Sequence, residues 1–258
     1  MTDRSFSDVS LAALYDVLNP WGPSDDFYLD LVMAARSVLD VGCGTGRLLA
    51  RAREEGHAGR LCGLDPAAAM LVQARGQADV EWVLGDLGSV RWEREFDLVV
   101  MTGHAFQVLV GDEEVRSALA TVRRALGDGG RFVFETRNPA VRAWETWRPE
   151  RAREVSDAHG DAVRVRHEVE APVLGDRVTF RETFEHARWG WPRVSRSTLR
   201  FLGADALREF LREAGLVVHE QYGDWGRRPL SPTAPEIITV AGRGLTPATP
   251  ASTPADRT

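Results

Sequence analysis

The stretch "VLDVGCGTGRLLA", residues 38–50, decides the fold of this chain. It places three glycines within five positions, between an apolar run typical of a strand and a run typical of a helix. A glycine-rich turn between a strand and a helix lets a ligand approach the backbone closely, and the amino end of the helix favours anions. A turn that is tight for structural reasons alone would look the same, so its meaning depends on the residues downstream of it.

The segments after this turn alternate between strand-like and helix-like patterns. Five short apolar runs are expected to be strands covered on both faces, over 37–41, 60–65, 80–84, 96–101 and 130–136. Helical patterns lie between them, over 45–56, 66–76 and 112–130, and the last begins with acidic residues and ends in a glycine stop. This order predicts right-handed crossovers and an α/β fold with a doubly wound, mostly parallel sheet.

The flanking segments add to this core. Residues 10–36 have the pattern of two helical pieces, broken at 19–23. Residues 162–189 and 193–202 alternate polar and apolar side chains, which predicts a small antiparallel sheet inserted after the fifth core strand. A helix and two further strands then return to the core and complete a seven-stranded sheet, over 203–215, 216–222 and 236–242.

Composition limits the classes of function. The net charge of −6 argues against nucleic acid as a bulk partner, because a phosphate backbone attracts concentrated positive charge. The first residues lack the basic and apolar regions of a secretory signal, and no apolar run approaches a membrane span. We therefore expect a cytoplasmic protein with no membrane partner. Cys43 and Cys62 have no CxxC spacing and no histidine cluster nearby, so neither a metal nor a disulfide is expected.

Two carboxylates downstream of the glycine turn indicate what kind of ligand it binds. The spacing of Gly42, Gly44 and Gly46 is one residue tighter than the dinucleotide fingerprint. Asp65 ends the second predicted strand, where a carboxylate can accept both hydroxyls of a ribose. Asp86 follows the third predicted strand, where it can accept from an exocyclic adenine amine. Two acids at the ends of neighbouring strands repel unless something polar lies between them, which favours a bound nucleoside.

Four motifs in this order carry a resemblance to a known family. "LDVGCGTG", "GLDPAAAML", "GDLGSV" and "FDLVVMTGHAF" resemble the successive motifs of the class I S-adenosylmethionine-dependent methyltransferases, and the match covers residues 39–134. "LREAGLVVHE" and the last two predicted strands resemble the closing reversed-strand hairpin of that family. The resemblance implies a Rossmann-like methyltransferase fold, S-adenosylmethionine as cofactor and S-adenosylhomocysteine as product.

The resemblance also implies residue roles at the cofactor. Asp40 would help to hold the methionine amino group, and Asp65 would take the ribose hydroxyls. The other implied contacts are the backbone of Gly42, Cys43 and Gly44 beside the methionine, Pro66, Met70, Asp86 and Leu87 at the adenine, the carbonyl of Thr102 at the amino group, and Tyr15 as an aromatic cover. Structural alternatives stay open: Met70 suits a core position, Tyr15 packing of the first helix, and Asp40 capping of the glycine loop.

Catalytic and acceptor residues are less sharply defined. His104 follows the fourth predicted strand, where it can act as a base, bind the cofactor carboxylate or cap the next helix. Arg137 can meet an acidic group on the acceptor, although an ion pair with Glu135 or Glu145 is equally compatible with the sequence. The candidate acceptor contacts are Trp21, Arg137, His167, Tyr222 and Trp225.

We therefore expect a methyltransferase that moves a methyl group to an oxygen or nitrogen atom of a small molecule by in-line displacement, as a monomer or homodimer. A cyclisation or rearrangement with the same cofactor, and a non-catalytic cofactor-binding protein, are the alternatives. A nicotinamide dehydrogenase is disfavoured by the glycine spacing. The expected parts are a helical cap, a cofactor-binding core, a lid, the end of the core and a disordered tail, over 1–36, 37–150, 151–202, 203–243 and 244–258.

Overall fold

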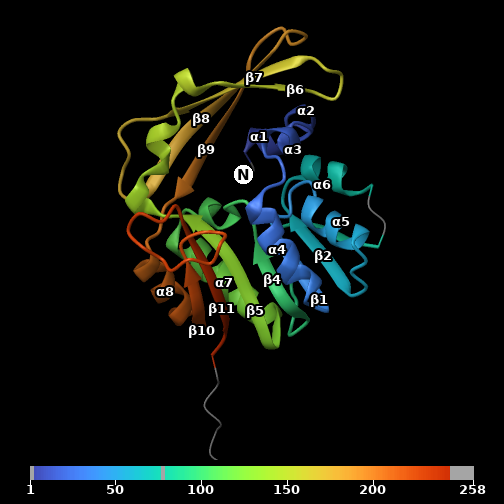
Figure 1. The fold of residues 1–258 in the computed structure, drawn as a ribbon, viewed down its shortest axis with the longest axis vertical. Coiled ribbons are helices and arrows are strands. Elements are labelled where there is room, and N and C mark those ends of the chain that lie inside the picture. The colour runs from blue at the N-terminus through green and yellow to red at the C-terminus, as the bar shows by residue number, and fades with distance from the viewer. Residues whose placement is uncertain (1–2, 77–78, 245–258) are drawn as a thin grey trace, which may run out of the picture.

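The computed structural model describes residues 3–76 and 79–244, which form two sheets with helices around the larger one (Figure 1). The seven-stranded sheet has the order β10-β11-β5-β4-β1-β2-β3, and only β11 runs against the others. Its strands are β1 (Ser37–Val41), β2 (Arg60–Asp65), β3 (Glu81–Leu84), β4 (Phe96–Met101), β5 (Leu126–Arg137), β10 (Leu216–Tyr222) and β11 (Glu236–Arg243). The predicted doubly wound fold is confirmed.

Helices cover both faces of this sheet because successive strand residues point to opposite sides. In β1, Leu39 belongs to the apolar cluster that includes Val115 of α7 and Leu207 of α8, whereas Val38 belongs to the cluster with Val32 of α4 and Leu49 of α5. The helices of the core are α4 (Pro23–Met33), α5 (Arg47–Glu54), α6 (Ala68–Ala74), α7 (Asp112–Ala125) and α8 (Ala204–Glu213). Asp40 shares the face of Val38 and is buried with it.

The predicted helix over 112–130 is too long. α7 ends at Ala125, and the glycine-rich residues after it already belong to β5. There the pairing of β5 with β4 shifts from Phe96 opposite Leu126 to Leu98 opposite Arg131. A Cβ on Gly130 would lie 2.9 Å from the carbonyl oxygen of Phe96, so this close approach of two strands requires glycine. The glycines therefore permit an irregular strand here, as well as ending a helix.

The first of the two predicted N-terminal helical pieces is divided between two short helices, and a third short helix precedes it. These are α1 (Arg4–Ser7), α2 (Val9–Ala12) and α3 (Tyr15–Leu18). The carboxylate of Asp8 accepts a hydrogen bond from the N–H of Ser10 at 3.0 Å, which caps α2 and separates it from α1. The second piece begins at Pro23, the last residue of the predicted break.

The second sheet packs on these short helices rather than on the large sheet. Its antiparallel order is β6-β7-β8-β9, from β6 (Arg153–Ser156), β7 (Ala162–Val169), β8 (Arg177–His186) and β9 (Arg193–Arg200). β6 has no counterpart among the predicted strands, because four residues with two charges carry little pattern. Leu11 and Leu14 share an apolar cluster with Val165 and Phe184. Figure 1 shows the small sheet and α1–α3 as one layered unit beside the large sheet.

The second sheet and the N-terminal helices are also joined by polar contacts. The backbone N–H of Ser5 donates to Ser195 Oγ at 2.9 Å, and Arg193 lies 2.7 Å from the carboxylate of Asp8. Within 3–76 and 79–244, no helix is long and apolar enough to cross a membrane. The predicted disordered tail lies outside the described residues, apart from Gly244.

We predict that Gly46→Ala destabilises the protein by about 1–3 kcal/mol more than Gly56→Ala. Both glycines have positive φ, +74° and +90°, so both variants share the backbone strain. A Cβ on Gly46 would collide with the Trp82 ring and lie 2.9 Å from Ala74 Cβ, whereas one on Gly56 meets nothing within 4 Å. Urea unfolding of both variants measures the difference, and equal stabilities would contradict the packing described here.

Candidate active site

A hollow of about 390 Å³ opens at the carboxyl ends of β1, β4 and β5. In a parallel α/β sheet this edge is where ligands bind, and the volume falls within the range of about 300–1,000 Å³ typical of small-molecule sites. α3 and the start of α4 close it from the side. Among the predicted site residues, those that border it are Tyr15, Asp40, Gly42, Cys43, Gly44, Thr102, His104 and Arg137.

The glycine turn after β1 has two different tasks. Gly42 and Gly44 both have positive φ, +73° and +56°. A Cβ on Gly42 would lie 3.0 Å from Ala105 Cβ, so this glycine allows two turns to pack. A Cβ on Gly44 would meet nothing within 4 Å among the described residues. Gly44 therefore leaves its backbone open to the hollow, as a ligand that lies against the main chain requires.

Asp40 is the buried acid of the hollow. Its side chain is 1% exposed, and its Oδ1 has no hydrogen-bond partner in the described part of the chain. Burial, followed by the charges of Asp65 and Glu135, raises the pKa of Asp40 to about 8. A buried carboxylate oxygen without a donor is costly, and a cationic ammonium group would offset that cost. The amino group of S-adenosylmethionine fits this requirement.

The two acids predicted at the nucleoside have backbone partners. Asp65 accepts hydrogen bonds from the N–H groups of Gly44 and Ala67, each at 2.8 Å, and burial raises its pKa despite these donors. Asp86 accepts from the N–H of Gly88 at 2.9 Å in a local turn. These contacts partly explain both acids without a ligand. Both oxygens of Asp65 still have a second lone pair, and Asp86 Oδ2 accepts no hydrogen bond from the described residues, so ribose and adenine contacts stay a prediction.

The predicted adenine contacts lie away from the hollow. Met70 is 1% exposed in an apolar cluster with Ala12, and Leu87 is buried in the main core. Pro66 is exposed. The packing alternative therefore fits Met70, whereas burial of the Leu87 side chain does not test the predicted contact of its backbone amide. Tyr15 packs edge-on against Phe6, with the ring centroids 6.2 Å apart.

His104 is held by two carboxylates. It adopts a left-handed backbone conformation with φ of 63°, which is uncommon for a residue other than glycine. Its N–H donates to Glu135 Oε1 at 2.6 Å, and its Nε2 lies 3.0 Å from Glu236 Oε2. The other oxygen of Glu135 accepts from the hydroxyl of Tyr28. Burial raises the pKa of Glu135. The backbone of His104 is thus positioned by a carboxylate from the adjacent strand.

Glu135, Glu236 and Tyr28 also belong to the site, although the sequence motifs do not include them. A signal existed for Glu135, because it is the one charged residue within the apolar stretch "FVFET", and charged residues are almost never fully buried without a partner. Glu236 and Tyr28 gave no such signal. Glu236 begins a strand, and Tyr28 has the spacing of an ordinary core residue in α4.

Arg137 has neither of the ion pairs compatible with the sequence. Glu145 pairs with Arg142 at 3.0 Å, and Glu135 is occupied by the hydroxyl and N–H described above. The guanidinium donates to Gln107 Oε1 at 3.0 Å and lies over the ring of Trp147, with Cζ 5.4 Å from the centroid. Burial lowers the pKa of Arg137.

The other candidate acceptor residues do not border the hollow. Trp21 donates to Asp26 at 2.7 Å, and Trp225 packs against Phe27 with the centroids 5.7 Å apart. Tyr222 packs against the same cluster as Trp225. His167 lies 2.9 Å from Glu182 within the second sheet. The structure therefore brings only Arg137 of this group to the hollow.

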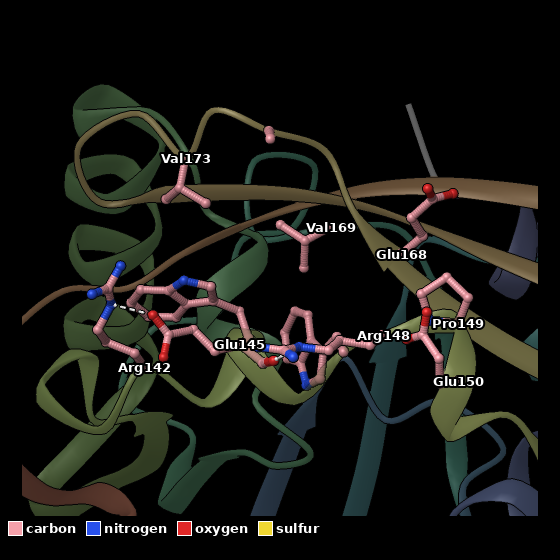
Figure 2. A pocket seen from close by; sticks show the side chains of 11 residues that line it. Arg142, Glu145, Arg148, Pro149, Glu150, Glu168, Val169 and Val173 are labelled. Atoms are coloured by element: carbon pink, nitrogen blue, oxygen red, sulfur yellow. Dashed lines mark hydrogen bonds and ion pairs between the residues drawn. The ribbon is translucent and has the colours of Figure 1, made fainter.

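A second hollow of about 440 Å³ lies beside the helical turns that come after β5 (Figure 2). Its labelled side chains include Arg142 and Glu145, joined by their ion pair, and Val169 of β7. None of its lining residues is buried, whereas the first hollow contains buried Asp40. A reaction that requires a desolvated polar group is therefore more compatible with the first hollow than with the second. Trp147 borders the second one and covers Arg137 of the first.

One group in the second sheet has the donor set of a metal site. Ligand atoms of Asp157, Asp161 and His186 all lie within 4.8 Å of one another. Arg188 Nε lies 2.7 Å from Asp161 Oδ2 and already neutralises part of this charge. These polar contacts stabilise the turn between β6 and β7.

Comparisons with known proteins agree with this geometry. Residues 38–130 match the family model described as a methyltransferase domain. The chain is 34% identical over 152 residues to 2-phytyl-1,4-naphtoquinone methyltransferase of Thermosynechococcus vestitus, covering 52% of this chain and 65% of that protein. It is 34% identical over 108 residues to the cypemycin N-terminal methyltransferase of a Streptomyces species, covering 41% and 43%.

The fold has a full-length counterpart among solved structures. The CcbJ methyltransferase of Streptomyces caelestis superposes with a TM-score of 0.72 and 21% identity, over 95% of this chain and 100% of that one. The chain spans only 42–65% of the length of the curated relatives that it matches. Residues 38–130 are thus a methyltransferase domain, and the fold is that of S-adenosylmethionine-dependent methyltransferases, as the motifs predicted.

We predict that Asp40→Asn changes the pH dependence of stability. The pKa of Asp40 is about 8 in the folded protein against 3.8 for an unperturbed side chain, so the unfolded state ionises first. Asp40 therefore lowers the free energy of unfolding progressively as the pH rises from 4 to 8. Relative to Asp40→Asn, the wild type should lose stability over this interval and change little below it. A difference that is constant with pH in urea unfolding would contradict the raised pKa.

Proposed function

We propose that this chain transfers a methyl group from S-adenosylmethionine to an oxygen or nitrogen atom of a small molecule by in-line displacement. The observation that carries the proposal is one hollow in which an unpartnered buried carboxyl, an open glycine backbone and a held histidine meet. When bound, S-adenosylmethionine supplies a methyl group on a positively charged sulfur. The cytoplasmic location and the small-molecule acceptor are parts of this proposal.

The residues of the chain have distinct tasks in binding. Asp40 accepts from the methionine amino group together with the carbonyl of Thr102, and Gly44 lets the ligand lie on the backbone. Asp65 takes the ribose hydroxyls while it braces the glycine turn through the N–H of Gly44, 2.8 Å from its Oδ2. These contacts position the reacting groups and exclude water, both of which accelerate a displacement of this kind.

His104 is the residue placed to take a proton. If its Nε2 carries a hydrogen donated to Glu236, 3.0 Å away, Nδ1 is unprotonated and can accept one. Glu135 supports this by holding the backbone of His104. A base of this kind serves a hydroxyl acceptor, whereas a neutral amine needs none for the attack itself.

The names of the sequence relatives do not specify one acceptor. One is named for the N-terminus of cypemycin and the other for 2-phytyl-1,4-naphtoquinone. The two matches cover only 41% and 52% of this chain. The chemistry of the acceptor is therefore read from the hollow itself.

We expect Asp65→Asn to weaken binding of S-adenosylhomocysteine by about tenfold or more, because an amide cannot accept on both atoms from a ribose diol. Titration calorimetry of the purified protein measures the affinity. Asp97→Asn is the matched control: Asp97 lies in β4 near the opposite edge of the sheet and pairs with Arg36 at 3.6 Å. Affinity unchanged in Asp65→Asn would remove the ribose from this position, and no binding to the wild type would refute the proposed function.

We expect His104→Ala to lower kcat by about 100-fold with a hydroxyl acceptor and to change the affinity for S-adenosylhomocysteine by less than about threefold. Transfer of labelled methyl from S-adenosylmethionine to a panel of phenols and amines identifies the acceptor and measures turnover. His159→Ala, an exposed position in a turn of the second sheet, is the control. Equal losses of turnover and affinity would assign His104 to cofactor binding instead.

A further inference from the structure

We propose that Arg137 binds an anionic group, a carboxylate or a phosphate, on the methyl acceptor. The inference rests on the proposed function, because it names a chemical class of acceptor for the same hollow. The evidence is the set of contacts around the Arg137 guanidinium and the position of Arg137 relative to Asp40.

Arg137 is the cation of the hollow that has no acidic partner. Three positively charged or titratable nitrogen side chains border the hollow, Arg47, His104 and Arg137. Arg47 lies 2.9 Å from Asp25, and His104 lies 3.0 Å from Glu236. Among the described residues, no carboxylate oxygen lies within 4.0 Å of the Arg137 guanidinium.

The guanidinium is also fixed in position. Gln107 is fully buried, and its Oε1 accepts from the Arg137 side chain at 3.0 Å and from its backbone N–H at 3.3 Å. The amide of Gln107 is itself held, because its Nε2 donates to the carbonyl of Arg200 at 2.9 Å. The Trp147 ring covers one side of the guanidinium at 5.4 Å. An arginine has five N–H donors, so this arrangement leaves several of them for a planar anion.

Partial burial without a charge in contact is the energetic reason for a ligand. Taking a guanidinium out of water is costly unless an anion offsets the loss, and an arginine stays charged in proteins. A neutral hydrogen bond to Gln107 and an aromatic face recover only part of this cost. A carboxylate or phosphate that arrives with the acceptor would supply the rest and would form charge-assisted hydrogen bonds.

The place of Arg137 favours the acceptor over the cofactor. Arg137 ends β5, and β4 lies between β5 and the strand that leads into the glycine turn. Its aromatic cover, Trp147, packs against Phe180 of the second sheet with the centroids 4.8 Å apart. The guanidinium thus lies toward the second sheet, and Asp40 lies on the side of the glycine turn. The two charges can bind opposite ends of a ternary complex.

The test measures anion binding by titration calorimetry, with and without S-adenosylhomocysteine. The probes are benzoate, inorganic phosphate and glucosamine 6-phosphate, with benzyl alcohol and glucosamine as neutral counterparts. The variants are Arg137→Gln and Arg137→Lys. Arg142→Gln is the matched control, because Arg142 is an exposed arginine near an aromatic ring, 5.9 Å from the Trp144 centroid, outside the first hollow.

We expect the wild type to bind at least one anion in the millimolar range or tighter, and about tenfold better than its neutral counterpart. Benzoate against phosphate distinguishes the two kinds of anion. Arg137→Gln should weaken this binding by about tenfold or more, Arg137→Lys should weaken it less, and Arg142→Gln should match the wild type. Affinity for S-adenosylhomocysteine should stay within about threefold in all variants.

Three results would overturn the inference. The first is a wild type that does not distinguish anions from neutral counterparts, and the second is an Arg137→Gln variant that binds anions as well as the wild type. The third is a loss of S-adenosylhomocysteine affinity of about tenfold in Arg137→Gln, which would assign Arg137 to the cofactor carboxylate. Absence of S-adenosylhomocysteine binding in the wild type would instead refute the proposed function, and the titrations without it still decide on the anion.

Discussion

The structure depends on the burial of carboxylates at the end of a sheet made mostly of apolar side chains. Glu135 and Asp40 are each 1% exposed. Such groups are costly unless donors or opposite charges offset the loss of water. Tyr28 and the backbone of His104 donate to Glu135, whereas Asp40 keeps one oxygen without a partner in the residues described. Glu135 therefore joins α4 to the turn after β4, and Asp40 remains available to a ligand.

The hollow has a carboxyl group on one side and a guanidinium on the other. Asp40 and the glycine turn define the side that suits a cationic amino acid, and Arg137 defines the side that suits an anion. His104 comes after β4, and its Nε2 lies 3.0 Å from Glu236 Oε2 of β11. A methyl donor and an acceptor bound to these two sides would meet near the histidine. The arrangement explains how a small set of charges can orient two ligands in one cavity.

The layer above the hollow combines segments that are far apart in the chain. Ser5 of α1 bonds to Ser195 of β9, and Asp8 pairs with Arg193. The apolar side chains of α2 and α3 fill the inner face of the same sheet. A cap and a lid with separate sequence patterns thus pack as one body, and Trp147 connects that body to Arg137.

Local patterns in the chain are sufficient to predict the strands of the large sheet, the glycine turn and Asp40 at its entrance, because continuous apolar runs and glycine spacing are read over a few residues. They do not predict the pairing of Tyr28 with Glu135, which are separated by 107 positions in the sequence. They also do not predict the pairing of Gln107 with Arg137, which are separated by 30 positions. They also overestimate the length of α7, and they do not predict that Trp225 packs against Phe27 and away from the border of the hollow. Such contacts depend on strand register and helix crossover, which are decided only when the chain packs, since many partners satisfy the same local pattern.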